Sequence, residues 1–254
     1  MDAVERLGND FRAAMDGADT VLGAADLLCQ ACVDFLEVDG ASVSLVHEGS
    51  TQGTFGSSGE LSRRLDEYQF TFGEGPCLDA VRGATPVLVP DLGDSAEQRW
   101  PAFRQAVIGE GIRAVFALPV TVTSSPIGAL DLFSARSGGL TQDRLTGGLV
   151  AARLAAGPLI KLMTSDVDWE SAGEGTPGWE TLASLERVEV YQATGMIVGA
   201  LEVDPVEALV RLRAHAYAHG MTASEVAWAI VERQLSLEDD AWRRGAAGSE
   251  DDSR

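Results

Sequence analysis

The spacing of apolar residues differs between two regions of the chain, one that ends near residue 163 and one that begins at Leu182, and it predicts a different architecture for each. In the first region, short apolar runs rich in β-branched residues and bounded by glycine, proline or serine predict strands. The expected strands cover residues 41–46, 51–55, 86–89, 112–122 and 126–135. The first two predict a hairpin, and the last two predict buried strands joined by a tight turn at Ser124-Ser125-Pro126.

Apolar residues at helical spacing predict helices between and around these strands. The expected helices cover residues 21–36, 77–82, 94–108 and 142–163. Asp19 or Thr20 can cap the first helix and Thr141 the last, which is expected to bend at Gly157-Pro158. This order of elements is typical of an α+β domain, with an antiparallel sheet and helices packed on one face.

From Leu182 onward the pattern is almost continuously helical. The expected helices cover residues 182–201, 205–220 and 223–236. Asp204 can cap the second of them, and Glu225 lies three residues after Thr222, which is the spacing of a capping box. Three short helices in so few residues predict a compact bundle.

Composition sets the expected domain boundaries. The stretch after the first region is rich in glycine and acidic residues and lacks periodicity, which predicts a linker. The acidic end of the chain predicts disorder. We expect a first domain at 1–164, a linker at 165–180, a three-helix domain at 181–236 and an acidic disordered tail at 237–254.

One side of the helix expected at 182–201 carries neither charge nor bulk. Gln192, Gly195, Met196 and Gly199 fall together on this side of a helical wheel, opposite the residues that can pack inward. Each glycine inside a helix costs about 1 kcal/mol relative to alanine. A surface so small and flat lets another backbone come close, which fits either a helix crossing in a dimer or a bound nucleic acid.

The next helix carries Arg211 and Arg213, which are two residues apart and cannot both lie on one narrow stripe. Arginines in this setting either face solvent or hold phosphates and stack on bases.

Short motifs in all three helices resemble the ANTAR domain, a three-helix RNA-binding module of bacterial antitermination regulators. The motifs are Gln192-Ala193-x-Gly195, Glu207-Ala208, Leu212-Arg213-x-x-Ala216 and Val226-Ala227. The resemblance covers about 182–235 and implies binding to stem-loops in nascent RNA. The residues that it implies for RNA binding are Gln192, Ala193, Thr194, Gly195, Met196, Arg211, Arg213 and Ala216.

Charge limits how such binding can work. The chain has a formal net charge of −20 and a pI of about 4.4, so any contact with RNA must be local. Residues 180–236 contain four arginines, no lysine and eight acidic residues. Few phosphate contacts predict weak, salt-sensitive binding, or a homodimer that presents two modules at once.

Three stretches of the first region, 73–92, 99–120 and 126–135, resemble the GAF domain that precedes ANTAR modules in actinobacterial regulators. The resemblance spans Asp19 to Met163 and implies small-molecule sensing and dimerisation through terminal helices. A sheet roofed by loops would offer an apolar pocket. The candidate lining residues, each of which could equally be plain core, are Phe72, Cys77, Asp91, Trp100, Phe103 and Phe116.

Candidate chemistry in this region is sparse. His47 is its only histidine, so no two-histidine metal or haem site is expected, and we expect no cofactor and no catalytic residue. Cys29 and Cys32 share a helix face, which fits packing better than redox chemistry. Cys77 lies in a Gly-x-Gly-x-Cys loop that resembles the loop of free-methionine-sulfoxide reductases, but the second cysteine that this chemistry requires is absent from 99–115.

The opening residues carry charge and lack the pattern of a signal peptide, and no run of 18 apolar residues occurs. We therefore expect a cytoplasmic protein without membrane contact. The main hypothesis is a regulator, and not an enzyme, in which a GAF sensor controls an RNA-binding module. The alternatives are a ligand-sensing or dimerisation module that does not bind RNA, and a thiol reductase that uses Cys77.

Overall fold

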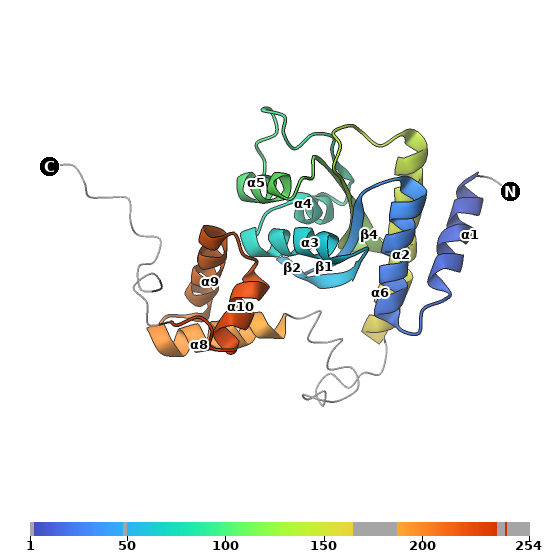
Figure 1. The fold of residues 1–254 in the computed structure, drawn as a ribbon. Coiled ribbons are helices and arrows are strands. Elements are labelled where there is room, and N and C mark those ends of the chain that lie inside the picture. Colours follow the sequence, from blue (N-terminus) through green and yellow to red (C-terminus); the bar gives the residue numbers. More distant parts are fainter. Residues whose placement is uncertain (1–2, 48–49, 165–186, 238–241, 243–254) are drawn as a thin grey trace. The chain divides into compact units, whose positions relative to one another are not determined.

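The computed structural model describes residues 3–47, 50–164, 187–237 and 242, which belong to two compact units divided between residues 186 and 187 (Figure 1). The linker expected at 165–180 lies outside the described residues, as does most of the tail expected at 237–254.

The first unit is built on a five-stranded antiparallel sheet with the strand order β2-β1-β5-β4-β3. The strands are β1 (Gly40–His47), β2 (Ser50–Ser57), β3 (Val87–Val89), β4 (Ala114–Val122) and β5 (Ser125–Ser134). All five expected strands are present. The turn between β4 and β5 comprises Thr123 and Ser124, one residue earlier than predicted, with Thr123 in the left-handed region at φ 59°.

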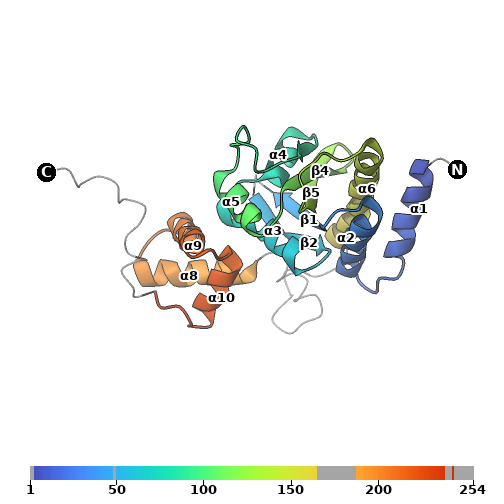
Figure 2. The same ribbon diagram turned by 45° about the horizontal axis from the view of Figure 1, so that its top comes forward.

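Helices cover both faces of this sheet, as two views of the ribbon show (Figures 1 and 2). On one face lie α2 (Val21–Leu36) and α6 (Gln142–Thr164), with α1 (Ala3–Met15) packed outside them. On the other lie α3 (Glu60–Phe72) and α4 (Pro76–Gly83), with α5 (Pro101–Gly109) against α3. The prediction of helices on one face and a roof of loops on the other was wrong.

The helix α3 escaped prediction because the side that it buries is largely polar. Ser62, Asp66, Gln69 and Thr71 are buried beside Leu65, Tyr68 and Phe70. The polar residues outnumber the apolar ones on the buried side and obscure the helical spacing of the latter. The α1 helix was also not predicted. The α5 helix begins at Pro101, seven residues later than expected.

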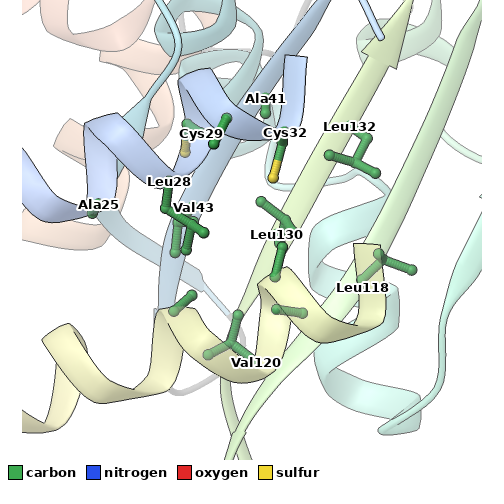
Figure 3. Close-up of a cluster of buried hydrophobic side chains, with 14 of the residues drawn as sticks. Ala25, Leu28, Cys29, Cys32, Ala41, Val43, Leu118, Val120, Leu130 and Leu132 are labelled. Carbon is green, nitrogen blue, oxygen red and sulfur yellow. The ribbon is translucent and has the colours of Figure 1, made fainter. Parts of the chain in front are cut away.

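The face under α2 and α6 is an apolar core. Leu28, Cys29 and Cys32 of α2 pack over Val43 and Leu130 of the sheet, together with further aliphatic side chains from β4 and β5 (Figure 3). Both cysteines are fully buried, as their shared helix face predicted. The capping prediction for α2 also holds, because the Thr20 hydroxyl accepts a hydrogen bond from the Gly23 amide at 2.9 Å.

The second unit contains α8 (Val188–Leu201), α9 (Pro205–His219) and α10 (Ala223–Val231). The Asp204 carboxylate accepts from the Glu207 amide at 2.9 Å, and Thr222 and Glu225 form the expected capping box. The core is made of small and aliphatic side chains: Val190, Ala193, Ile197, Ala208, Leu212, Ala216, Ala223, Val226, Ala227 and Ile230. The predicted fold class, α+β followed by a small three-helix unit, is confirmed.

Within the described part of the chain, no helix combines the length and the apolar character needed to cross a bilayer.

Candidate functional sites

The uncharged side of α8 is exposed to solvent. A Cβ atom built on Gly195 or Gly199 would meet no other atom within 4 Å, apart from the helix's own nearby backbone. Gln192 and Met196 lie on the same side and are exposed, with Met196 at 37%. Tyr191 borders them at 65% exposure. Neither glycine is needed for packing within the described residues, and the space beside both is open.

Not all residues expected on the RNA-binding surface are accessible. Ala193 and Ala216 are completely buried in the core of the second unit, so their placement on the surface was wrong and their small size serves helix packing. Thr194 is half-buried, and its hydroxyl donates to the Val190 carbonyl at 2.7 Å, one turn earlier in α8.

The two arginines of α9 lie about 200° apart around the helix, as their spacing predicted. The Arg211 side chain is only 16% exposed and is ion-paired with Glu207, with Nε donating to the carboxylate at 3.1 Å. Its Nη1 also donates to the Trp242 carbonyl at 2.5 Å. The Arg213 side chain is half-buried, and burial, followed by the nearby Arg187 cation, lowers the pKa of its guanidinium.

A stack of three rings covers one side of α9. The rings of His215 and His219 are 4.0 Å apart at 24°, and the Trp242 indole lies on the His215 ring at 4.5 Å and 8°. Trp242 is 3% exposed, although it falls within the segment expected to be a disordered tail. Burial, followed by His219, lowers the pKa of His215. The sequence signal for this contact was a tryptophan in an otherwise acidic segment. The prediction of a disordered tail did not take it into account.

The residues predicted to line a pocket of the first unit do not come together. Phe72, Trp100 and Phe103 belong to one apolar cluster beneath α3 and α5, which is core. Phe116 packs on the opposite face of the sheet, under α2 and α6. Asp91 lies at the surface, where the Arg113 guanidinium at 2.7 Å, and then the Gly93 amide, lower its pKa. The six residues therefore do not line one pocket, and the prediction that they do was wrong.

A buried polar cluster lies between the sheet and the helices α3 and α4, and it contains Cys77. The Asp66 carboxylate accepts from the Ser44 hydroxyl and, at 2.5 Å, from the Thr54 hydroxyl. One turn along α3, the Gln69 side chain donates to Asp131 Oδ2 at 2.5 Å and accepts from the Cys77 amide at 2.8 Å. Ser44, Thr54 and Asp131 come from strands, in which these polar residues are interspersed with core residues. The sequence pattern therefore gave no sign of the cluster.

The hydrogen bonds of this cluster are incomplete among the described residues. Asp131 Oδ1 and the Ser42 hydroxyl are buried and have no hydrogen-bond partner. Ser42 and Asp131 are partners across β1 and β5, so their side chains stand next to each other on one face. Burial, followed by the charge of Asp66, raises the pKa of Asp131, and the Gln69 hydrogen bond opposes this rise. A polar atom left unbonded in the interior costs about 1 to 3 kcal/mol.

The environment of Cys77 does not favour a thiolate. The side chain is fully buried, and burial, followed by Asp131 and Asp66, raises the pKa of the thiol. Burial likewise raises the pKa values of Cys29 and Cys32. Nucleophilic cysteines instead lie in accessible, electropositive surroundings.

We expect all three cysteines of the native protein to resist alkylation by iodoacetamide at pH 8, with rates roughly a hundredfold or more below those of the unfolded chain. Mass spectrometry of tryptic peptides measures each site separately, and labelling in guanidinium chloride serves as the control. Rapid native labelling of Cys77 alone would contradict this and would favour the thiol-reductase alternative.

The first unit is thus an α+β domain of three layers, with an antiparallel sheet between an apolar helix layer and a layer that covers a polar cluster. Residues 18–156, more than half of the chain, match the family model described as GAF domain. The chain belongs to the GAF domain family. The match ends at residue 156, so α8, α9 and α10 lie outside it.

Solved structures of similar fold include the GAF domain of a phosphoenolpyruvate-protein phosphotransferase from Coxiella burnetii. Its TM-score is 0.50 at 15% identity, over 63% of this chain and 94% of that chain. The GAF domain of the corresponding Acinetobacter protein gives a TM-score of 0.48 at 12% identity, over 64% and 96%. At these identities the likeness concerns the fold alone. No curated protein matches the chain.

Proposed function

We propose that this protein is an RNA-binding transcription antitermination regulator, in which the GAF domain acts as a sensor that controls the C-terminal three-helix unit. The observation that carries the proposal is the open surface around Gly195 and Gly199, within motifs that resemble the ANTAR domain. Bound there, a stem-loop of nascent RNA would be kept from forming a terminator hairpin.

The shape of the α8 surface suits a nucleic acid. With no side chain at Gly195 and Gly199, a sugar-phosphate backbone or an unstacked base can approach the helix closely. The exposed Gln192 amide can bond a base edge, and the exposed ring of Tyr191 can stack on one. Recognition would then rest on fit and stacking rather than on charge, since cations are scarce in this unit.

Dimerisation would compensate for the weak affinity of a single three-helix unit for RNA. Leu149 and Ile160 of α6 are 41% and 39% exposed, and their spacing of eleven residues puts them on the same side of the helix. These two exposed apolar side chains, with Arg153 between them, support pairing of two copies through α6. Two RNA-binding units held together bind tandem stem-loops more tightly than one unit binds a single loop.

The polar cluster of the GAF domain supports its role as a sensor. Asp131 Oδ1 and the Ser42 hydroxyl would gain a hydrogen-bond partner from a small polar ligand. Such a ligand would have to displace α3 or α4, which cover this face, and the displacement could be passed on to the rest of the chain.

The proposal is tested by a gel-shift titration of the full-length protein against RNA with two tandem hexaloop hairpins. We expect tighter binding to this RNA than to a scrambled sequence of equal length. The slope of log K against log salt should be no steeper than about −4 per module, because residues 180–236 hold only four cations. Equal affinity for both RNAs would overturn the proposal.

Replacing Gly195 by leucine is expected to weaken hairpin binding about tenfold or more, because the new side chain fills the approach to α8 without touching the rest of the unit. Far-UV circular dichroism should stay unchanged. Gly109→Leu is the matched control, since Gly109 is also helical, exposed and clear of other atoms, but lies in the GAF domain. Loss of the dimer with RNA binding intact would instead assign the α8 surface to a protein interface.

A further inference from the structure

The ring stack on α9 has the features of an occupied binding site. Arg211, His215 and His219 recur every fourth residue and therefore line one side of the helix. The indole of Trp242 lies nearly parallel to the His215 ring and is almost completely buried, although Trp242 is distant from α9 in the sequence. The contact is thus a tertiary one, made by a residue beyond the end of the three-helix unit.

The contact between α9 and Trp242 has the chemistry of nucleotide recognition. A flat bicyclic ring stacked on an imidazole has the size and geometry of a purine on an aromatic platform. Arg211 at the same time donates to the Trp242 carbonyl, an oxygen acceptor beside the ring. In the sequence, Glu238, Asp239 and Asp240 precede Trp242 with only Ala241 between them, so the segment combines negative charge with a ring as a nucleotide does.

A surface hollow of about 450 Å³ lies beside Arg211, which belongs to this side of α9. It is lined by Ala200, Leu201, Glu202 and Arg211, at the place where α8 ends. A nucleotide stacked on His215 could therefore place its neighbouring sugar and phosphate beside Arg211.

We propose that the side of α9 formed by Arg211, His215 and His219 is a binding site for an unstacked base of an RNA loop, and that Trp242 occupies it as an intramolecular competitor. This inference rests on the proposed RNA-binding function. It adds a second contact surface to that of α8, and it gives the C-terminal segment a regulatory role, since RNA has to displace Trp242 to engage the platform.

The experiment measures the affinity of full-length Trp242→Ala for a hairpin with a purine-rich hexaloop and for the same hairpin with an abasic loop. We expect the variant to bind the purine loop about fivefold more tightly than the wild type, and the abasic loop with unchanged affinity. Trp242→Phe keeps an aromatic ring on His215 and should behave as the wild type. Adding His215→Ala to Trp242→Ala should remove the gain.

Each other outcome contradicts the inference in a distinguishable way. If the wild type and Trp242→Ala bind the hairpin specifically and with equal affinity, Trp242 does not compete with RNA. The proposed RNA-binding function would still stand. Weaker binding by Trp242→Ala, with an unchanged melting temperature, would mean that Trp242 itself contacts RNA and does not compete with it. If no variant binds the hairpin better than scrambled RNA, both the proposed function and the inference fail.

Discussion

Replacing Gly128 by alanine is expected to lower the free energy of unfolding of the GAF domain by about 3 kcal/mol. Gly128 lies in β5, between the paired neighbours β1 and β4. A Cβ atom at this position would come within 2.0 Å of the Ser44 carbonyl oxygen and 3.2 Å of its carbon. These are backbone atoms, so the clash cannot be relieved by turning a side chain, and the central strands would have to separate.

Calorimetry of the full-length chain checks this, because each unit can give its own transition. Gly109→Ala is the control, since Gly109 lies at the end of α5 and a Cβ atom there would meet no atom within 4 Å beyond its own helix and chain neighbours. Alanine there should raise stability by up to about 1 kcal/mol through helix propensity. An unchanged GAF transition in Gly128→Ala would mean that β1 and β5 do not pair as described.

Replacing Asp131 by asparagine is expected to stabilise the GAF domain at pH 8 by about 1 to 3 kcal/mol, the cost of a buried polar group with incomplete hydrogen bonds. The amide is neutral and can still accept from Gln69. It can also offer a donor to the unpartnered Ser42 hydroxyl across the strands. The gain should depend on pH, because the pKa of Asp131 is raised in the folded state by burial and by Asp66.

The direction of this dependence follows from proton linkage. A carboxyl whose folded pKa exceeds the unfolded value of about 3.9 binds more protons when folded. Its contribution to stability is fully present below the unfolded pKa and is lost as the pH rises through the folded pKa. The wild type and Asp131→Asn should therefore be closest in stability near pH 4 and diverge toward pH 8.

Urea unfolding at several pH values measures this divergence. Asp91→Asn is a control in which stability should depend on pH in the opposite direction. Arg113 lowers the pKa of Asp91, so the contribution of the Asp91 carboxylate to stability is present at neutral pH and is lost on acidification. Destabilisation by Asp131→Asn at pH 8 would show that the carboxylate is better satisfied than its described partners indicate. Stabilisation would mean that the chain keeps Asp131 for a reason other than stability, as binding sites often require.

Elements whose buried side is apolar were predictable. The helix α2, the strands β4 and β5 and the three helices of the second unit all have regular apolar spacing and recognisable caps such as Thr20, Asp204 and Thr222. The bare side of α8 was predictable for a related reason. A helix that buries one apolar stripe must expose the opposite one, and Gly195 and Gly199 are on it.

The functional groups were harder to foresee. The polar cluster joins Ser44, Asp66, Gln69, Cys77 and Asp131, which come from the four elements β1, α3, α4 and β5. Only Cys77 was singled out from the sequence. The six expected pocket residues were chosen by type, and the sheet places Phe116 and Phe103 on opposite faces.

The amino-acid sequence by itself determined the five strands, the helices whose buried side is apolar, several caps and the uncharged side of α8. Each of these depends on residues within one or two helical turns or one strand. Tertiary structure alone decided which polar residues meet beneath α3 and that Trp242 covers His215. Those contacts depend on chain segments far apart, whose meeting is fixed by strand order and helix packing rather than by any local pattern.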